Sequence, residues 1–486
     1  MLAPHLEIGG ADKFNLDLIQ RLQQDHGYEV SIITTRSSPH RWREQFEHLT
    51  PDVFILHTLL PVEDYPQFIS NFIQTRKPDT VLITNCRIGY QLLPLLRTAG
   101  GPSFVDYLHM EDWDHQSYPR LSLHYASYLD GTIVSSGYLK QRLIEAGGNP
   151  NRIHVATTNI DPQLWNSSDY DKPSIRARYG VPEDVPVIAF VGRLCRQKQP
   201  DVMANVLKTI RDRGLEFVCL VAGDGDYRPW LEKFVSKQRL PEIKLLGAIP
   251  SEQVREILAI SDLYFMPSEN EGIALTLFEA MSMAVPAVAA DVGGQAELVS
   301  ADCGILIKPG PLQEVEYADT LERLLNDPDL RRSMASRSRG RICDRFTLEE
   351  MGNRMAQLFE CAAANSTFEP GLAHTTPVTE ELPSRFSRFL TTTLLLLSPR
   401  NLGLKLRNLS LLGSIYFHPE KRRRLAATFN ARYYLSHNPD LKARGVAPLI
   451  HYALQGYLEG RLPSPHFDPA DRFGVNPMLW RIYQRD

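Results

Sequence analysis

Two acidic residues in one short stretch of the sequence could hold a ligand. In PSENEGIALTLFEAMS, residues 267–282, Glu271 and Glu279 stand eight positions apart among mostly apolar and small residues. Gly272 follows the first acid directly, and a glycine lets the backbone pass close to a ligand. The pattern DLYFMPS predicts a strand before the acids, and LTLFEAMSM predicts a helix after them. Glu271 is therefore expected at the carboxyl end of the strand, and Glu279 about one turn into the helix.

The predicted helix start between the two acids suits a phosphate. Free N–H groups at a helix N-terminus attract phosphate, whereas carboxylates are good acceptors for sugar hydroxyls. A nucleotide sugar has both kinds of group, with a ribose on one side of its diphosphate and a hexose on the other. These residues alone leave two readings open: a nucleotide-sugar site, or a surface helix that carries an incidental glutamate.

Two cations precede this stretch in the same half of the chain. In VGRLCRQKQPD, Arg193 ends a predicted strand, and Lys198 follows five residues later in the loop before a helix. Charge-assisted hydrogen bonds from such a pair suit a diphosphate. Loops often carry Arg and Lys, so this pair indicates a diphosphate site only together with the two acids.

The elements that must position these residues form two sets of strands. Short apolar runs alternate with helix-length segments, which is typical of parallel sheets covered on both faces. The runs lie at 29–34, 52–58, 80–84, 103–109, 131–136 and 152–158, and again at 187–193, 216–224, 243–247, 262–268, 285–291 and 304–309. Two sets in tandem predict an α/β protein with two Rossmann-like domains facing a cleft, where open α/β sheets bind their ligands.

Helical periodicity supports this alternation. In KFNLDLIQRLQQDHG, Phe14, Leu18 and Leu22 mark one face, and Gly27 closes the helix. In SEQVREILAISD, Ser251 is the expected N-cap.

Composition limits the class of protein. The chain has 486 residues, 43% hydrophobic and 23% charged, which is ordinary for a soluble globular protein. A formal net charge of -4 gives no reason to expect nucleic acid as a partner. Six scattered cysteines without a CxxC pair fit a reducing compartment and argue against a zinc site. Because no signal peptide and no apolar run of about 18 residues is present, we expect a cytoplasmic protein.

The composition changes after the second set of strands. Residues 365–384 are typical of a flexible linker. Residues 385–424 are locally basic with interleaved leucines, so a segment lying on the inner face of the membrane is one reading. A solvated helical hairpin packed on the domains is the other and favoured reading. The aromatic-rich segment 425–486 predicts a small helical module.

Five motifs together resemble those of the retaining GT-B glycosyltransferases of family 4. GRLCRQKQPD, AGDGDYRPWLE, LGAIPSEQV, SDLYFMPSENEGIALTLFEAMSMAVPAVAADVGGQAELV and CGILIKP occur in that family's order and spacing, and Glu-x7-Glu is its signature. The resemblance implies a GT-B fold and a nucleotide-diphosphate sugar as donor substrate, without a cofactor or metal. It also implies transfer, with retention, to a glycan or lipid-linked acceptor in polysaccharide or cell-surface glycan biosynthesis.

The resemblance also assigns roles to single residues. Arg193 and Lys198 would bind the donor diphosphate and stabilise the leaving group. Glu271 would contact the donor sugar, and Glu279 would hold the ribose hydroxyls. With His109 of DYLHMED, which matches the family's active-site histidine, the residues expected in catalysis are His109, Arg193, Lys198 and Glu271.

Backbone groups complete the expected donor site. The family's Gly-Gly loop matches LEIGGADKF, so Gly9 and Gly10 would approach the donor. The amides of the segment that follows Glu271 would lie near the distal phosphate, at Gly272, Ile273, Ala274 and Leu275.

The same resemblance divides the chain. We predict an N-terminal acceptor domain at 1–165, a nucleotide-sugar donor domain at 166–364, the linker and basic segment at 365–424, and the module at 425–486. That module resembles one attached to glycosyltransferases and other surface-polysaccharide proteins.

The sequence departs from the family's pattern at two places. Only MLAP precedes HLEIGG, which implies either a start further upstream or a weakened edge of the first sheet. In TNIDPQLW one residue is missing from the family's turn, although Asn159 and Asp161 match. Separately, GDGD at 223–226 contains the Asp-x-Asp pattern that binds a divalent metal in another glycosyltransferase fold. Its position at a strand end favours a glycine-rich turn beside the nucleotide.

Three other functions are less well supported. A nucleotide-sugar epimerase of the same fold would need further acids and a histidine near the sugar. A non-catalytic glycan-binding scaffold would not need the full set Arg193, Lys198, Glu271 and Glu279. A nicotinamide dehydrogenase is disfavoured because no GxGxxG follows a first strand.

Overall fold

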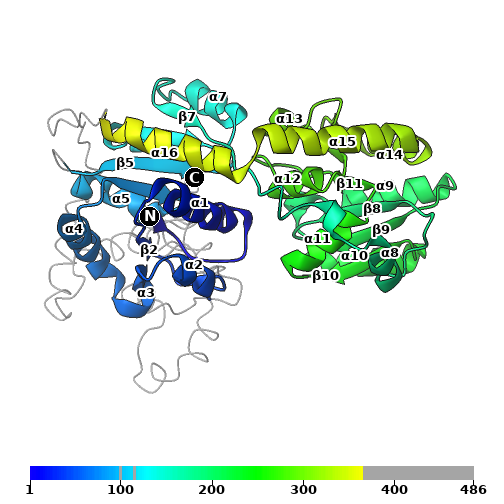
Figure 1. Cartoon of the computed structure of the whole chain (residues 1–486), viewed down its shortest axis with the longest axis horizontal. Helices are drawn as coiled ribbons and strands as arrows, with labels where there is room; N and C mark the ends of the chain where they lie inside the picture. The colour runs from blue at the N-terminus through cyan, green and yellow to red at the C-terminus, as the bar shows by residue number, and fades with distance from the viewer. Residues whose placement is uncertain (98–100, 113–116, 365–486) are drawn as a thin grey trace, which may run out of the picture. The chain divides into compact units, whose positions relative to one another are not determined.

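The computed structural model describes residues 1–97, 101–112 and 117–364 (Figure 1). The predicted linker and basic segment at 365–424 and the predicted module at 425–486 lie outside the described residues. In the described ranges, no helix combines the length and the apolar character that crossing a membrane requires.

The first sheet is parallel and has seven strands, in the order β3-β2-β1-β4-β5-β6-β7. These strands are β1 (Leu2–Ala3), β2 (Ile32–Thr34), β3 (Val53–Ile55), β4 (Thr80–Thr84), β5 (Ser103–Leu108), β6 (Gly131–Val134) and β7 (Ile153–Val155). Its helices are α1 (Gly10–His26), α2 (Arg43–Leu49), α3 (Leu56–Leu59), α4 (Tyr65–Arg76), α5 (Arg87–Leu96), α6 (Tyr118–His124) and α7 (Gly137–Glu145). Each of the six predicted runs contains one strand.

The remaining strand, β1, corrects one expectation. It has two residues and pairs with β2 on one side and β4 on the other. The short strand is therefore in the middle of the sheet, and the expected weakening of a sheet edge is wrong. A short interior strand is held from both sides, because both neighbours supply ladder hydrogen bonds.

The second sheet is also parallel and has six strands, in the order β10-β9-β8-β11-β12-β13. Its strands are β8 (Val187–Val191), β9 (Val218–Ala222), β10 (Ile243–Gly247), β11 (Leu263–Met266), β12 (Ala287–Ala290) and β13 (Gly304–Ile307). The helices that follow β7 are α8 (Lys172–Arg178), α9 (Pro200–Asp212), α10 (Arg228–Gln238), α11 (Ser251–Ala259), α12 (Leu275–Ser282), α13 (Gln295–Leu298), α14 (Gln313–Asn326), α15 (Pro328–Arg345) and α16 (Leu348–Ala364). Every predicted run of the second set contains one of these strands.

Both faces of the second sheet are buried, as its continuous apolar runs predict. In β8, Ala189 belongs to the core cluster that includes Phe278 of α12. Its neighbours Ile188 and Phe190 point to the opposite face and join the cluster that includes Met203 of α9. This alternation follows from the two-residue repeat of a strand.

The predicted end of α1 is confirmed, and the predicted N-cap of α11 is wrong. The expected face of α1 is buried, and Gly27 ends the helix in the left-handed conformation, with φ 70°. Ser251, however, is not the N-cap of α11. Pro250 is the last extended residue there, with φ −61° and ψ 153°, so Ser251 is already the first helical residue.

The chain crosses between the two sheets twice, and the crossings lie side by side. Ile160 pairs with Thr347 in a parallel bridge. The amide of Ile160 donates to the carbonyl of Phe346 at 3.0 Å, and the amide of Leu348 donates to the carbonyl of Ile160 at 3.0 Å. Asn159, in the left-handed region at φ 57°, donates its side-chain amide to the carbonyl of Thr347 at 2.9 Å.

The second crossing returns the chain to the first sheet. Helix α16 packs against α1 and β5 (Figure 1). Its residues Met355 and Phe359 share a core cluster with Phe14. The last helix of the predicted range 166–364 therefore covers the first sheet rather than the second. Below, the first lobe means the seven-stranded sheet with α1–α7 and α16, and the second lobe means the six-stranded sheet with α8–α15.

Candidate functional site

Lys198 and Glu271 form a buried ion pair. The Lys198 Nζ atom lies 2.5 Å from Glu271 Oε1, and the two side chains are 13% and 9% exposed. Lys198 ends a 3₁₀ turn after β8, and Glu271 lies in the loop between β11 and α12, where the sequence predicted it. A lysine ammonium has three donors. The described residues accept one of them, so two remain for the oxygens of a ligand.

Gln197 ties the loop of the cations to the loop of Glu271. Its side-chain amide donates to the carbonyl of Asn270 at 2.8 Å, and its own carbonyl accepts from the amide of Glu269 at 2.7 Å. Arg193 is exposed and donates from Nη2 to Gln197 Oε1 at 3.2 Å. Gln197 could not be singled out from the sequence, because a glutamine between two cations is common in a loop.

Arg193 lies beyond the strand rather than at its end, which corrects a prediction. The strand β8 ends at Val191 because the chain turns at Gly192 to meet the GDGD turn. There a Cβ atom on Gly223 would lie 1.8 Å from the carbonyl oxygen of Gly192. The close approach places the cation loop directly over the carboxyl end of β9.

The first turn of α12 has open amides. Its N-cap is Ala274, whose side chain cannot accept a hydrogen bond. Within the described ranges, no acceptor meets the amides of Ile273, Ala274 and Leu275. Open amides and the positive end of the helix dipole attract an anion.

Tyr264 fixes that first turn against the neighbouring strand. This tyrosine is fully buried in β11. Its hydroxyl hydrogen-bonds with the carbonyl of Val191 at 3.1 Å and with Thr276 Oγ1 at 2.7 Å. The start of α12 and the loop of the two cations are therefore held side by side, as the diphosphate reading requires.

Gly272 meets the backbone of the other lobe. A Cβ atom at this position would lie 2.1 Å from the carbonyl oxygen of His109 and 3.4 Å from Ser135 Oγ. Ser135 donates to the same carbonyl at 2.7 Å. Sequence reasoning expected room for a ligand here; the room is taken by the first lobe, which brings His109 next to Glu271 in space.

The imidazole of His109 is neutral. It follows β5 and packs on Phe14 and Tyr107, with ring centroids 5.3 Å and 4.7 Å away. Burial lowers the pKa of His109 to about 3. Its Nε2 atom is buried and has no hydrogen-bond partner among the described residues. Buried polar atoms are rarely left unpaired, so this nitrogen is suited to a ligand hydroxyl.

The predicted Gly-Gly loop lies opposite α12. Gly9 is the N-cap of α1, and Gly10 is its first residue. A Cβ atom on Gly10 would lie 4.0 Å from the Cβ atom of Leu275. The two helices thus begin at nearly the same point from opposite lobes, with the open amides of α12 between them.

Glu279 lies one turn further along α12 and has an unusual protonation equilibrium. Burial raises the pKa of Glu279 to about 7. Of the charged residues on α1, Lys13 opposes this increase and Asp17 reinforces it. Arg255 of α11 also opposes it. No described residue hydrogen-bonds its carboxylate, which keeps some accessible surface. Such an acid can accept hydrogen bonds from a ligand.

This equilibrium predicts a pH-dependent difference in stability. Because the pKa of Glu279 is higher in the folded protein than its ordinary value, the folded state binds more protons between about pH 4.5 and pH 7. Raising the pH through that window should therefore destabilise the wild type relative to Glu279→Gln, with no further change above it. Thermal melting of both proteins from pH 4.5 to pH 8 measures this. Parallel curves would contradict the raised pKa.

The carboxylate of Asp224 in the GDGD turn already has hydrogen-bond partners within the protein. Asp224 accepts from the amide of Gly225 at 2.7 Å and from Arg228 Nη1 at 2.8 Å. In the part of the chain that the structure describes, no group of three or more His, Cys, Asp or Glu residues could hold a metal ion.

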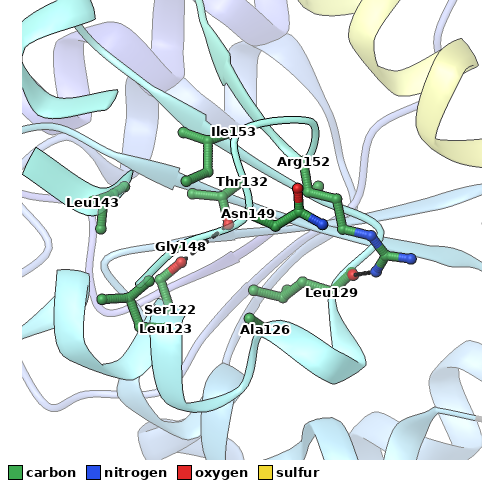
Figure 2. Close-up of a pocket in the computed structure, with 11 residues that line it drawn as sticks. Ser122, Leu123, Ala126, Leu129, Thr132, Leu143, Gly148, Asn149, Arg152 and Ile153 are labelled. Carbon is green, nitrogen blue, oxygen red and sulfur yellow. Dashed lines mark hydrogen bonds between the residues drawn. The ribbon is translucent and has the colours of Figure 1, made fainter. Parts of the chain in front are cut away.

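One small cavity lies at the other end of the first sheet. It has a volume of about 30 Å³ and is lined by the amino ends of β6 and β7, with Thr132 and Ile153, and by Leu143 of α7 (Figure 2). Figure 2 shows Ser122 bonded to Thr132 and Arg152 bonded to the carbonyl of Leu129 on its walls. None of the predicted site residues lines this cavity, so it does not belong to the candidate site.

The structure thus brings the sequence-predicted residues together around the start of α12. Three residues that hold this arrangement were not predicted from the sequence. Gln197 and Tyr264 hold the loops, and Glu297 of the second lobe accepts hydrogen bonds from the amides of Gly137 and Tyr138 of the first lobe. Glu297 stands in the quoted motif VGGQAELV, but an acid on a short helix carried no signal of its own.

Comparison with protein families covers both lobes. Residues 8–164 match the family Glycosyltransferase Family 4, and residues 171–341 match the family Glycosyl transferases group 1. The alpha-D-kanosaminyltransferase of Streptomyces kanamyceticus is 30% identical over 189 residues, which are 39% of this chain and 48% of that protein. The D-inositol 3-phosphate glycosyltransferase of Corynebacterium aurimucosum is 30% identical over 258 residues, 50% of this chain and 60% of that protein. The chain spans about half the length of the curated relatives it matches.

Solved structures show the same fold. A glycosyltransferase from Rickettsia africae superposes with a TM-score of 0.64 at 17% identity, covering 75% of this chain and 98% of that one. The Anabaena protein HepE in complex with UDP superposes with a TM-score of 0.63 at 21% identity, covering 74% and 98%. The predicted fold, GT-B with two Rossmann-like domains, is confirmed.

Proposed function

The chain carries a Glycosyltransferase Family 4 domain followed by a Glycosyl transferases group 1 domain, and from this premise we propose which reaction it performs. It transfers a sugar from a nucleotide-diphosphate sugar to a glycan or lipid-linked acceptor, with retention of the anomeric configuration. The product belongs to a polysaccharide or cell-surface glycan. The proposal includes the first lobe as acceptor domain and the second lobe as donor domain.

One observation carries this proposal: a buried Lys198–Glu271 pair beside uncapped helix amides. The diphosphate would lie between Lys198, Arg193 and the open amides of Ile273, Ala274 and Leu275. In that position the two free donors of the Lys198 ammonium would face phosphate oxygens, while its third donor holds Glu271 at the sugar side. Cations and a helix N-terminus together stabilise the negative charge that develops on a departing diphosphate.

The remaining predicted residues would surround the two sugars. Glu271 would accept hydrogen bonds from hydroxyls of the transferred sugar, and the neutral His109 would use its unpartnered Nε2 for another hydroxyl. Glu279 would accept hydrogen bonds from the ribose. Gly9 and Gly10 would lie over the diphosphate, because α1 and α12 begin opposite one another.

The chemical step then needs no enzymatic nucleophile. The bond between sugar C1 and the diphosphate oxygen breaks, and its electron pair leaves with the nucleotide diphosphate. The acceptor hydroxyl attacks C1 from the face that the diphosphate leaves, and its proton passes to the departing phosphate oxygen. The lobes would exclude water from this step and so limit hydrolysis of the donor.

A donor screen tests the function. Purified protein is incubated with UDP-, GDP- and ADP-sugars together with a panel of glycan and lipid-linked acceptors, and release of the nucleoside diphosphate is measured with and without a chelator. UDP-sugars come first because HepE is described in complex with UDP. We expect one donor to be turned over, and added chelator to leave the rate unchanged. Isomerised donor without released diphosphate would instead indicate an epimerase, and binding without turnover would indicate a scaffold.

A further inference from the structure

Glu297 of the second lobe caps a helix of the first lobe. Its Oε2 atom accepts from the amide of Gly137 at 2.8 Å, and its Oε1 atom accepts from the amide of Tyr138 at 2.7 Å. These are the first two amides of α7, and Ser136 Oγ accepts from the third, that of Leu139, at 3.1 Å. Helix α7 therefore takes its N-terminal caps from both lobes. A carboxylate at this position gains from two charge-assisted hydrogen bonds and from the helix dipole.

The surfaces around Glu297 are shaped for this contact. A Cβ atom on Gly137 would come within 3.4 Å of Glu297 Oε2. A Cβ atom on Gly294, three residues before Glu297, would lie 2.5 Å from the Cβ atom of Ser136. Gly294 has no room for a larger residue with the lobes as they stand, whereas a Cβ atom on Gly137 would make ordinary van der Waals contact with Glu297. The capping contact is therefore part of a fitted interface rather than a chance meeting of two side chains.

The same interface continues to the candidate donor site. Gly294 donates its amide to the carbonyl of Gly272 at 2.7 Å, and Gly272 abuts the carbonyl of His109. Asn270 adds a further bond between lobes, because its side-chain amide donates to the carbonyl of Glu111 at 3.1 Å. Glu297 is thus connected through Gly294 to the loop that carries Glu271.

An open groove flanks the outer side of this interface. It has a volume of about 500 Å³, and Tyr138, Asn270, Asp291 and Glu297 are among its lining residues. Neither Lys198 nor Glu271 lines it. Because Glu297 and Tyr138 line this groove, solvent can compete for the bonds of Glu297 to α7.

We propose that Glu297 is a positioning residue for the transfer reaction. By capping α7 it holds the lobes in the arrangement that places His109 against the loop of Glu271. In this role Glu297 acts through its bonds to Gly137 and Tyr138 rather than through contact with the donor. The kinetic part of this inference rests on the proposed function, whereas the structural part does not.

Amide hydrogen exchange on the full-length chain tests the structural part. The amides of Gly137 and Tyr138 have Glu297 as their only acceptor among the described residues. In Glu297→Gln one oxygen is replaced by an N–H₂ group that faces these donors, so we expect both amides to exchange about tenfold faster or more. Glu297→Asp should restore part of the protection. The control is Glu316→Gln, an exposed acid on α14, which should leave both amides unchanged.

Two further measurements decide whether the cap positions the lobes. Spin labels at Gln141 and Val315, with the exposed Cys343 and Cys361 and the half-buried Cys195 changed to serine, report the distance between lobes. We expect Glu297→Gln to shift this distance distribution to longer values. With the donor found in the screen, kcat should fall about tenfold while the Kd of the donor changes less than twofold.

The outcomes separate this inference from the proposed function. Unchanged exchange at Gly137 and Tyr138 would overturn the inference, and so would faster exchange with an unchanged distance between lobes, which makes Glu297 a local cap only. If no donor is turned over by the wild type, the proposed function fails, and the distance measurement still decides the role of Glu297.

Discussion

Lys198→Met lowers kcat for transfer by about a hundredfold to a thousandfold, which is the range for removing one donor that stabilises developing charge. The lysine is expected to oppose the charge on the departing diphosphate and to hold Glu271 by its 2.5 Å ion pair. Methionine keeps the length and apolar stem of the side chain but has no N–H donor. Initial rates with the donor found in the screen measure the effect. Lys208→Met, which removes a surface lysine paired with Asp212 on α9, is the matched control and should leave kcat unchanged.

Loss of activity must be separated from loss of folding. Removing one partner of a buried ion pair leaves the other charge unpaired and destabilises a protein by about 3–5 kcal/mol. Lys198→Met is therefore expected to melt at a lower temperature than the wild type. In the double variant with Glu271→Gln no charge is left unpaired, so most of that stability should return.

Rates measured well below the melting temperature of Lys198→Met separate the two effects. If the lysine acts in the reaction, kcat stays low there, where the variant is fully folded, although the double variant regains its melting temperature. If kcat of the folded Lys198→Met equalled that of the wild type, the low rate would be a folding defect and the catalytic role of the lysine would be wrong. Because the two residues act as a unit, the losses of kcat from the single variants should not add.

The sequence predicted the fold because the strands and helices depend on local patterns. Apolar runs of strand length identified the six strands of the second sheet. A cation pair and an acid pair at fixed spacings also predicted that these residues surround one ligand, because the carboxyl ends of parallel strands share one edge of a sheet. The ion pair between Lys198 and Glu271 was not predicted. Local patterns could not predict a two-residue strand such as β1, which has too few residues to show any periodicity.

Contacts between the lobes were beyond the sequence for a different reason. Glu297 and Gly137 are 160 positions apart, and nothing in the local sequence of either indicates the other. The position of helix α16 could not be predicted from the sequence either. This helix follows the second lobe in the chain, but it packs on α1 and β5 of the first lobe. Gly272 is another position whose contact with the other lobe could not be predicted from the sequence. Its pattern indicated a close approach of the backbone, whereas the identity of the approaching group depended on the tertiary structure.

Gly272→Ala is the second variant with a large expected effect, because it acts on that approach. A Cβ atom 2.1 Å from the carbonyl oxygen of His109 cannot be accommodated, so the loop of Glu271 or the first lobe must shift by about 1 Å. A displacement of this size can cost about a hundredfold in rate when it separates groups that act together. We therefore expect kcat to fall about a hundredfold. The control is Gly310→Ala, where no atom lies within 4 Å of the added Cβ.

Whether the loop of Glu271 or the first lobe shifts in Gly272→Ala identifies which contact the glycine maintains. If the lobes separate, the Gly137 and Tyr138 amides lose their acceptor, and they should exchange faster in Gly272→Ala, as in Glu297→Gln. If only the loop moves, those amides stay protected and the Lys198–Glu271 pair is disturbed instead, which the melting temperature reports. Normal kcat in Gly272→Ala would contradict both. It would mean that turnover proceeds from an arrangement in which His109 and Gly272 are apart, and then the contact between the lobes could not position any group for the reaction.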